Sequence, residues 1–194
     1  ARRPELLVVT KSTARSTVDR PGYLDYIAVK RFDAAGNVCG EDRFLGLFTS
    51  AAYAESVLRV PVLRRKVREV LDASGFDPAS HDGKNLLQLL ETYPRDELFQ
   101  ISAAELLPIA TSVLAMQERR QTRLFLRRDV YGRFMSCLVY LPRDRYTTAA
   151  RLDMEAILRE AFDGETVDYT ARVSESVLAR LHFVVRGRVG KPLP

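Results

Sequence analysis

The two histidines are the side chains whose ordinary pKa lies closest to neutral pH, so they are the first candidates for proton transfer. His81 lies in the turn-like stretch Pro-Ala-Ser-His-Asp-Gly before a predicted helix, where such residues commonly serve capping and solvation. His182 lies between Leu181 and Phe183 on a predicted strand with polar outward positions, which favours a surface or inter-domain face. Because neither has a nucleophile and an orienting group beside it, we predict no catalytic residue in this chain.

The carboxylates and thiols show no grouping that favours catalysis or metal binding. Asp153, Glu155 and Glu160 are spaced around the circumference of a predicted helix, which indicates a solvated surface rather than an acid–base pair. Cys39 and Cys137 lie in apolar, strand-like runs with no further ligands nearby. We therefore predict two buried free thiols and no metal site.

Nucleotide cofactors are commonly held by glycine-rich turns that bring backbone N–H groups close to phosphate. The sequence contains neither Gly-x-Gly-x-x-Gly after a strand nor Gly-x-x-x-x-Gly-Lys-Ser/Thr. We therefore predict no cofactor-binding residue and no cofactor in this chain.

The formal net charge of +5 raises the question of a nucleic-acid partner. Tyr131, Phe134 and Tyr140 are the candidate stacking rings. However, residues 130–134 lack the basic-Gly-aromatic-Gly-aromatic-Val pattern of the common RNA-binding sheet, and Phe134 and Tyr140 alternate as core residues do. We predict no nucleic-acid partner. Two basic runs form either a solvated face or a surface for an acidic partner: Arg64-Arg65-Lys66 and Arg127-Arg128.

The composition, with 46% hydrophobic and 28% charged residues, is typical of a folded globular protein. The 194 residues allow one ordinary domain or two small ones. The sequence has no apolar run long enough for a membrane span, and its first residues lack the apolar core of a signal peptide. We expect a cytoplasmic protein with no membrane partner.

The first half of the chain predicts strands followed by helices. Apolar runs predict strands at 6–10, 26–32 and 44–49, with a turn at 34–37 between the last two. From Ser50 the pattern becomes helical, and one predicted face carries Leu63, Val67, Val70, Leu71 and Ser74 before Gly75 ends the helix. A leucine-rich helix is predicted from Lys84 to Tyr93, where Pro94 ends it.

The second half has a clearer order. A short strand is predicted at Leu98–Ile101, and Ser102 with Glu105 forms a capping box for a helix to about Arg120, which Pro108 should kink. A hairpin follows at 123–128 and 134–141, then a helix from about Thr148 that stops at Asp163-Gly164, then strands at 167–173 and 180–186. Residues 97–187 thus predict an α+β, ferredoxin-like β-α-β-β-α-β module with an extra strand, in which an antiparallel sheet carries both helices on one face.

Several stretches, in order along most of the chain, closely resemble the amino-terminal region of the large bacterial NAD-specific glutamate dehydrogenases. They are residues 20–26 (RPGYLDY), 43–53 (RFLGLFTSAAY), 60–67 (VPVLRRKV), 81–84 (HDGK), 93–99 (YPRDELF), 125–129 (FLRRD) and 139–144 (VYLPRD). The resemblance implies a fragment of a much longer enzyme, whose substrate and NAD sites lie in a catalytic domain downstream.

The resemblance also implies a domain organisation and a function. Residues 1–95 are expected to form strands of a PAS-like domain plus a helical connector, residues 96–188 an ACT-like domain, and residues 189–194 a linker. ACT modules of other enzymes often bind amino acids beside a glycine in the first strand-to-helix loop, and Ser102-Ala103-Ala104 stands there without one, so the ligand-binding residues are unknown.

The expected function is that of a non-catalytic regulatory and assembly region. Its expected partners are other domains or subunits of the same enzyme, and an amino-acid effector is a further candidate partner. Two alternatives stay open: a stand-alone amino-acid-sensing module and an RNA-binding ferredoxin-like module.

Overall fold

The computed structural model describes residues 5–18 and 22–188. They form two compact units, one made of the described residues up to 65 together with 95–100, and the other made of 66–94 and the described residues from 101 onward. The predicted domains divide at residue 95 instead, so unit 2 includes the helical segment that was assigned to the first domain. The predicted linker at 189–194 lies outside the described residues.

Unit 1 is built on a three-stranded antiparallel meander of β1 (Leu7–Arg15), β2 (Tyr23–Phe32) and β3 (Val38–Gly46). The turn between β2 and β3 is ordered by Asp33, whose Oδ1 accepts hydrogen bonds from the backbone N–H groups of Ala35 and Asn37, both at 2.9 Å. Gly36 adopts a φ of 81°, which glycine accommodates without strain. The three predicted strands and the turn are confirmed, although β3 begins and ends earlier in the chain than expected.

Two short helices complete unit 1, and one of them corrects a prediction. They are α1 (Ser50–Ala54) and α4 (Arg95–Gln100). The strand expected at Leu98–Ile101 is wrong, because most of this run belongs to α4, which carries Asp96 and Glu97 in its first turn, where acidic groups favour the helix dipole. Leu98 and Phe99 are buried, and the Phe99 ring stacks on Phe48 at a centroid distance of 4.4 Å.

Three longer helices precede the second sheet: α2 (Pro61–Ser74), α3 (His81–Thr92) and α5 (Ala103–Arg119). The apolar positions predicted for α2 include its buried residues Leu63, Val67 and Val70, and Gly75 follows the helix with a φ of 72°. The predicted capping box of α5 is confirmed, since the Ser102 side chain accepts from Glu105 N and the Glu105 side chain accepts from Ser102 N.

Unit 2 contains a four-stranded antiparallel sheet. Its elements in chain order are β4 (Arg123–Arg128), β5 (Phe134–Pro142), the 3-10 turn η1 (Arg143–Arg145), α6 (Thr148–Ala161), β6 (Thr166–Arg172) and β7 (Leu178–Arg186). The strands lie in the order β4-β5-β7-β6. The hairpin, the following helix and the last two strands are therefore confirmed, and the described order from α5 onward is α-β-β-α-β-β.

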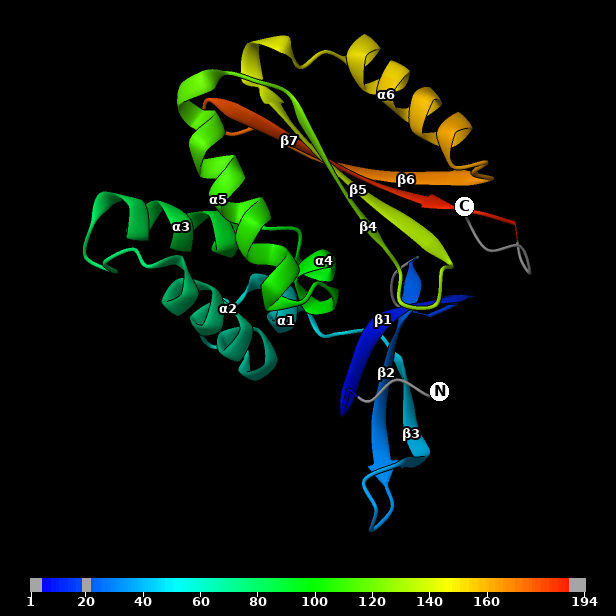
Figure 1. The fold of residues 1–194 in the computed structure, drawn as a ribbon. Coiled ribbons are helices and arrows are strands. Elements are labelled where there is room, and N and C mark those ends of the chain that lie inside the picture. The colour runs from blue at the N-terminus through cyan, green and yellow to red at the C-terminus, as the bar shows by residue number, and fades with distance from the viewer. Residues whose placement is uncertain (1–4, 19–21, 189–194) are drawn as a thin grey trace. The chain divides into compact units, whose positions relative to one another are not determined.

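The apolar core of unit 2 lies between one face of this sheet and α6, which runs alongside β6 and β7 (Figure 1). Cys137, Leu181 and Phe183 are fully buried there, and Leu158 of α6 belongs to the same cluster. The helix α5 instead meets the opposite face, where Arg123 of β4 donates a hydrogen bond to Ser112 of α5 at 2.7 Å. Unit 2 therefore differs from the predicted arrangement with both helices on one face.

The structure confirms the α+β class with antiparallel sheets. None of the helices in the described ranges has the length and apolar character needed to cross a lipid bilayer.

Candidate functional site

The two histidines lie on different elements and in different environments. His81 is the first residue of α3 and is exposed. His182 of β7 is buried, and its Nε2 lies 2.8 Å from Ser136 Oγ on the neighbouring strand β5. Of the two expected positions of His182, a surface or an inter-domain face, the solvent-exposed surface is wrong, because the ring is buried and bonded to Ser136 within the sheet.

The carboxylates of α6 match the predicted solvated helix surface. Asp153 and Glu160 are exposed, while Glu155 accepts hydrogen bonds from Arg151 and Arg159, both at 2.8 Å and one helical turn away on either side. These spacings build ion pairs along the helix.

The two thiols behave differently from each other. Cys137 of β5 is fully buried in the apolar core of unit 2, as predicted. Cys39 is exposed, which corrects the prediction of a second buried thiol. The apolar residues around Cys39 suggested burial, but β3 is an outer strand of its sheet and most of its residues are exposed to solvent.

The aromatic and basic candidates also separate. Phe134 and Tyr140 are buried, so their interpretation as core residues is confirmed, and Tyr131 lies against Arg133 with 4.8 Å between the guanidinium and the ring centre. Arg127 is buried near the Phe134 ring, whereas Arg64, Arg65 and Arg128 are exposed. The solvated-face reading is therefore wrong for Arg127.

The stretch Ser102-Ala103-Ala104, which stands where other ACT modules have their ligand-binding loop, is a helix start. Ser102 is exposed, and its Oγ accepts a hydrogen bond from Glu105 N at 3.2 Å and lies 2.6 Å from the Glu105 carboxylate. The element directly before Ser102 is the helix α4 and not a strand. The side chain of Ser102 is thus engaged in starting α5.

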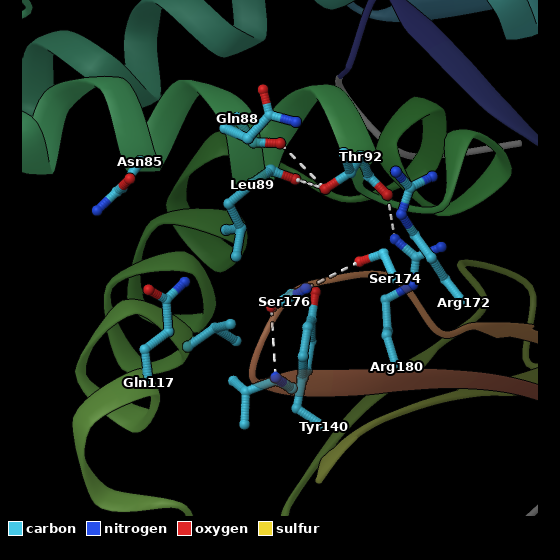
Figure 2. Close-up of a pocket in the computed structure, with 12 residues that line it drawn as sticks. Asn85, Gln88, Leu89, Thr92, Gln117, Tyr140, Arg172, Ser174, Ser176 and Arg180 are labelled. Atoms are coloured by element: carbon cyan, nitrogen blue, oxygen red, sulfur yellow. Dashed lines mark hydrogen bonds between the residues drawn. The ribbon is translucent and has the colours of Figure 1, made fainter. Parts of the chain in front are cut away.

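A polar pocket of about 150 Å³ lies elsewhere in unit 2 (Figure 2). One wall comes from α3 and α5, which pack against each other. Three amide side chains line this wall: Asn85 and Gln88 from α3 and Gln117 from α5. Leu89 and Val113 add apolar surface between them. The pocket therefore combines neutral hydrogen-bonding groups with apolar surface.

The facing wall is a row of side chains across the sheet. Tyr140 of β5 pairs directly with Arg180 of β7, which in turn pairs with Arg172 of β6. Directly opposed residues of antiparallel strands lie on the same face of a sheet. This row continues to Arg123 of β4, and it lies on the face opposite α6.

Arg180 is the central charged group of the pocket. It is half-buried, and its Nη1 donates a hydrogen bond to the backbone carbonyl of Thr92, the last residue of α3 (Figure 2). Its Nε is buried and has no hydrogen-bond partner among the described residues. Burial lowers the pKa of Arg180, the Tyr140 hydroxyl opposes this shift, and the charge of Arg172 adds to it.

Tyr140 supplies a neutral hydroxyl beside this cation. Burial raises the pKa of Tyr140 to about 12, and the charge of Arg180 and a hydrogen bond with it act in the opposite direction. Because the phenol stays protonated at neutral pH, it does not neutralise the guanidinium.

The loop between β6 and β7 forms the remaining edge of the pocket. Ser174 Oγ accepts a hydrogen bond from Ser176 N at 3.4 Å, and Ser176 Oγ accepts one from Leu178 N at 3.3 Å. Arg143 Nη1 also donates to the Ser174 carbonyl at 3.0 Å. These bonds order the loop and place two hydroxyl groups at the pocket.

The pocket thus contains two guanidinium groups, three amides and several hydroxyls, and none of its lining residues is acidic. This set of groups is suited to recognising an anion. Sequence reasoning missed the site, because its residues come from five elements and none belongs to a compact motif. The only local signal is the alternation of β7, which places Arg180 on the polar side of that strand.

Two family models match successive parts of the chain. Residues 60–119 match the model described as "Glutamate dehydrogenase, helical motif 1", and residues 123–194 match the model described as "Glutamate dehydrogenase, ACT2 domain". The first match spans the helices from α2 to α5, and the second begins with β4. Both regions are thus of the glutamate dehydrogenase class.

Curated relatives give the same result over nearly the whole chain. The chain is 47% identical to the NAD-specific glutamate dehydrogenase of Halomonas elongata over 98% of its length and 12% of the relative. It is 46% identical to the proteins of the same name from Pseudomonas aeruginosa and Mycobacterium tuberculosis, over 95% and 94% of this chain and 11% of each relative. The resemblance seen in the sequence is confirmed: the chain belongs, as one segment, to the family of NAD-specific glutamate dehydrogenases.

Proposed function

We propose that this chain is a non-catalytic regulatory and assembly region of an NAD-specific glutamate dehydrogenase, which converts glutamate, NAD and water to 2-oxoglutarate, ammonium and NADH. The supporting observation is that nearly the whole chain aligns with only 12% of such a protein, while residues 123–194 match a model named for an ACT2 domain. On this proposal NAD binds elsewhere in the parent enzyme, and the enzyme acts in the cytoplasm.

The ACT-like and PAS-like assignments are part of the same proposal. Within the expected range of 96–188, we assign the ACT-like domain to the described residues from 123 onward, which match the ACT2 model, and we assign the strands of unit 1, within residues 1–95, to a PAS-like domain. The antiparallel sheet of β4 to β7 and the helix α6 are consistent with the first assignment. In this role the region acts through differential contacts with other domains or subunits, which bias a distant catalytic site.

An apolar surface of unit 2 supports an assembly role. Leu124 and Leu126 are large apolar side chains that are about half exposed, and, two residues apart on β4, they lie on the same face of the sheet. Apolar side chains grouped on a surface often mark a protein–protein contact. Because β4 is an outer strand of its sheet, its free edge can also meet a neighbouring domain.

The test uses the full-length parent enzyme with Leu124→Ser and Leu126→Ser combined. We expect a smaller assembly by analytical ultracentrifugation, or a changed dependence of NADH formation on glutamate concentration, while turnover at saturating substrate is retained. Val62→Ser, an exposed apolar position on α2, is the matched control and should change neither.

Two results would contradict the proposal. Steady NADH formation from glutamate by these 194 residues alone would show that the chain is catalytic. A parent enzyme whose assembly and kinetics are unaffected by deletion of the region would show that it is neither regulatory nor structural.

The pocket of unit 2 favours a second candidate function, a stand-alone amino-acid sensor. This alternative requires that the protein be made without the rest of the enzyme, so the length of the polypeptide in cell extracts, measured by immunoblotting, decides between the two. The RNA-binding alternative has less support, because the candidate stacking rings of Phe134 and Tyr140 are buried.

A further inference from the structure

The pocket between the helices α3 and α5 and the sheet of unit 2 contains two cations without counter-ions. Neither Arg172 nor Arg180 forms a salt bridge with another residue in the described part of the chain. A half-buried guanidinium loses part of its hydration, and charged groups in such positions are generally paired. The pocket therefore has an unmet electrostatic requirement.

The register of the sheet keeps these two cations together. Arg172 and Arg180 are directly opposed on β6 and β7, where like charges repel each other. The lining residues include no carboxylate, and Glu175, which lies between Ser174 and Ser176 in the adjoining loop, is not among them. An anion bound beside both arginines would therefore offset their repulsion.

One backbone contact fixes the Arg180 guanidinium at the pocket. Its Nη1 donates a hydrogen bond to the Thr92 carbonyl, whereas its Nε is covered by protein atoms and has no hydrogen-bond partner among the described residues. Guanidinium groups bind carboxylates through charge-assisted hydrogen bonds. Arg180 is therefore held in place as a lining residue, and an anion would meet it from the pocket side.

We propose that this pocket binds a small organic acid, with Arg180 and Arg172 as partners of its carboxylate and the amide of Gln117 as a partner of its remaining polar groups. Because every lining residue belongs to unit 2, this site does not depend on what the parent protein catalyses. It also lies away from Ser102, the start of the loop that the ACT resemblance would suggest.

The size of the pocket limits the ligand. A cavity of about 150 Å³ is comparable to one that accepts a benzene-sized molecule. An organic acid of on the order of six to ten non-hydrogen atoms matches this scale.

The helix α3 favours a carboxylate over a phosphate dianion. Its residues Asn85, Gln88, Leu89 and Thr92 line the pocket along the helix, and the last of them, Thr92, brings the carbonyl-bearing end of the helix to one side of the site (Figure 2). This end carries partial negative charge, whereas phosphate sites commonly use the N–H groups at a helix N-terminus. A carboxylate has less charge to repel, and a hydroxyl or ammonium group on the ligand would find acceptors there.

The experiment is isothermal titration calorimetry of the full chain with succinate, L-glutamate, L-glutamine, inorganic phosphate and putrescine. We expect saturable binding of at least one carboxylate, weaker binding of phosphate and no binding of the dication. Arg172→Gln should weaken carboxylate binding about tenfold or more, because it removes a charge-assisted contact from an exposed side chain.

Arg180→Gln should weaken binding further, and circular dichroism will show whether this half-buried substitution still folds. Arg172→Gln keeps the test decisive if it does not. Arg145→Gln is the matched control, since it removes the same charge from an exposed arginine of η1 outside the pocket. We expect this control to bind as the unchanged chain does.

Three results would overturn the proposal: no saturable binding of any carboxylate, binding of phosphate alone, or an equal loss in Arg172→Gln and Arg145→Gln. Nuclear magnetic resonance adds an independent readout, because the side-chain amide signals of Gln117 should shift on binding. Shifts confined to other residues would place the ligand elsewhere. None of these measurements involves NADH. A negative result would therefore reject the binding site without deciding the proposed regulatory role, which has its own test.

Discussion

The two sheets of this chain use directly opposed residues in contrasting ways. In unit 1, opposite charges face each other across the strands: Lys11 pairs with Asp25 at 2.7 Å, and Lys30 pairs with Glu41. In unit 2, Arg180 faces Arg172 instead. Directly opposed residues of unlike charge therefore stabilise the first sheet without a ligand. In the second sheet, the directly opposed arginines repel each other, and a bound anion would offset this repulsion.

Burial differs between the sheets as strongly as charge. Every residue of β5 is buried, whereas most residues of β3 are exposed. The second sheet has a core against α6, so its stability depends mainly on apolar packing. The first sheet depends more on polar contacts across its strands, such as those around Glu41, which also accepts hydrogen bonds from Arg43 and Tyr26.

The largest expected effect is a loss of packing in unit 2. Phe183 is fully buried, so Phe183→Ala should lower the free energy of unfolding by about 3–5 kcal/mol. Leu45 of β3 is 60% exposed, and Leu45→Ala should change it by less than about 0.5 kcal/mol. Chemical denaturation of both variants measures the difference, and equal losses would contradict the contrast between the sheets.

A glycine in each unit gives a second test. A Cβ at Gly83 of α3 would lie 2.2 Å from the Asp77 carbonyl oxygen, and this backbone atom has little freedom to move. Gly83→Ala should therefore destabilise by about 1–3 kcal/mol, more than the gain of roughly 1 kcal/mol in helix propensity. A Cβ at Gly46 of β3 would have no atom within 4 Å, so Gly46→Ala should be nearly neutral. Thermal unfolding of the two variants measures both changes in stability.

The two sheets should lose stability at opposite ends of the pH scale. The hydrogen bond from Lys30 lowers the pKa of Glu41 from 4.5 to about 2, so its contribution is complete above pH 4.5 and is lost as the pH falls toward 2. Burial raises the pKa of Tyr140 from 10.0 to about 12, so its contribution is complete below pH 10 and is lost as the pH rises toward 12.

Hydrogen exchange measured peptide by peptide separates these two responses. Glu41→Gln should remove the acid response of β2 and β3, and Tyr140→Phe should remove the alkaline response of β5 and β7. If both peptides respond at the same pH, the two groups do not act locally.

The smallest effect concerns the thiols and leaves stability unchanged. Cys39 is exposed and Cys137 is fully buried, so iodoacetamide should label Cys39 in the native chain and both cysteines in denaturant. Peptide mass spectrometry reads the sites directly. Native labelling of Cys137 at the rate of Cys39 would show that the core of unit 2 opens readily.

Much of the fold was predictable because most elements carry a complete local pattern. Ser102 and Glu105 mark the start of α5, and the alternation of Leu181 and Phe183 with polar residues marks β7. The run Leu98–Ile101 was misread because a short run with three apolar residues satisfies a strand and a helical turn equally well. Its helix depends on non-local contacts, such as the stacking of Phe99 on Phe48.

The candidate site was beyond prediction for a related reason. Gln88, Tyr140 and Arg180 are separated by dozens of residues, and only the packing of α3 beside the sheet brings them to one pocket. Cys39 shows the same limit, because an apolar run does not reveal that its strand is the outer one of a sheet.

The pairing of β5 with β7 has a consequence for the precision of the anion pocket. The same ladder of hydrogen bonds sets Cys137 opposite Phe183 on one face and Tyr140 opposite Arg180 on the other. A shift of the strand register by one residue would turn the apolar face of β7 toward α3 and α5 and its charged face toward α6. The apolar packing between β7 and α6 therefore fixes the register that positions the Arg180 guanidinium. The rigidity of the proposed binding site thus depends on residues on the opposite face of the same strand.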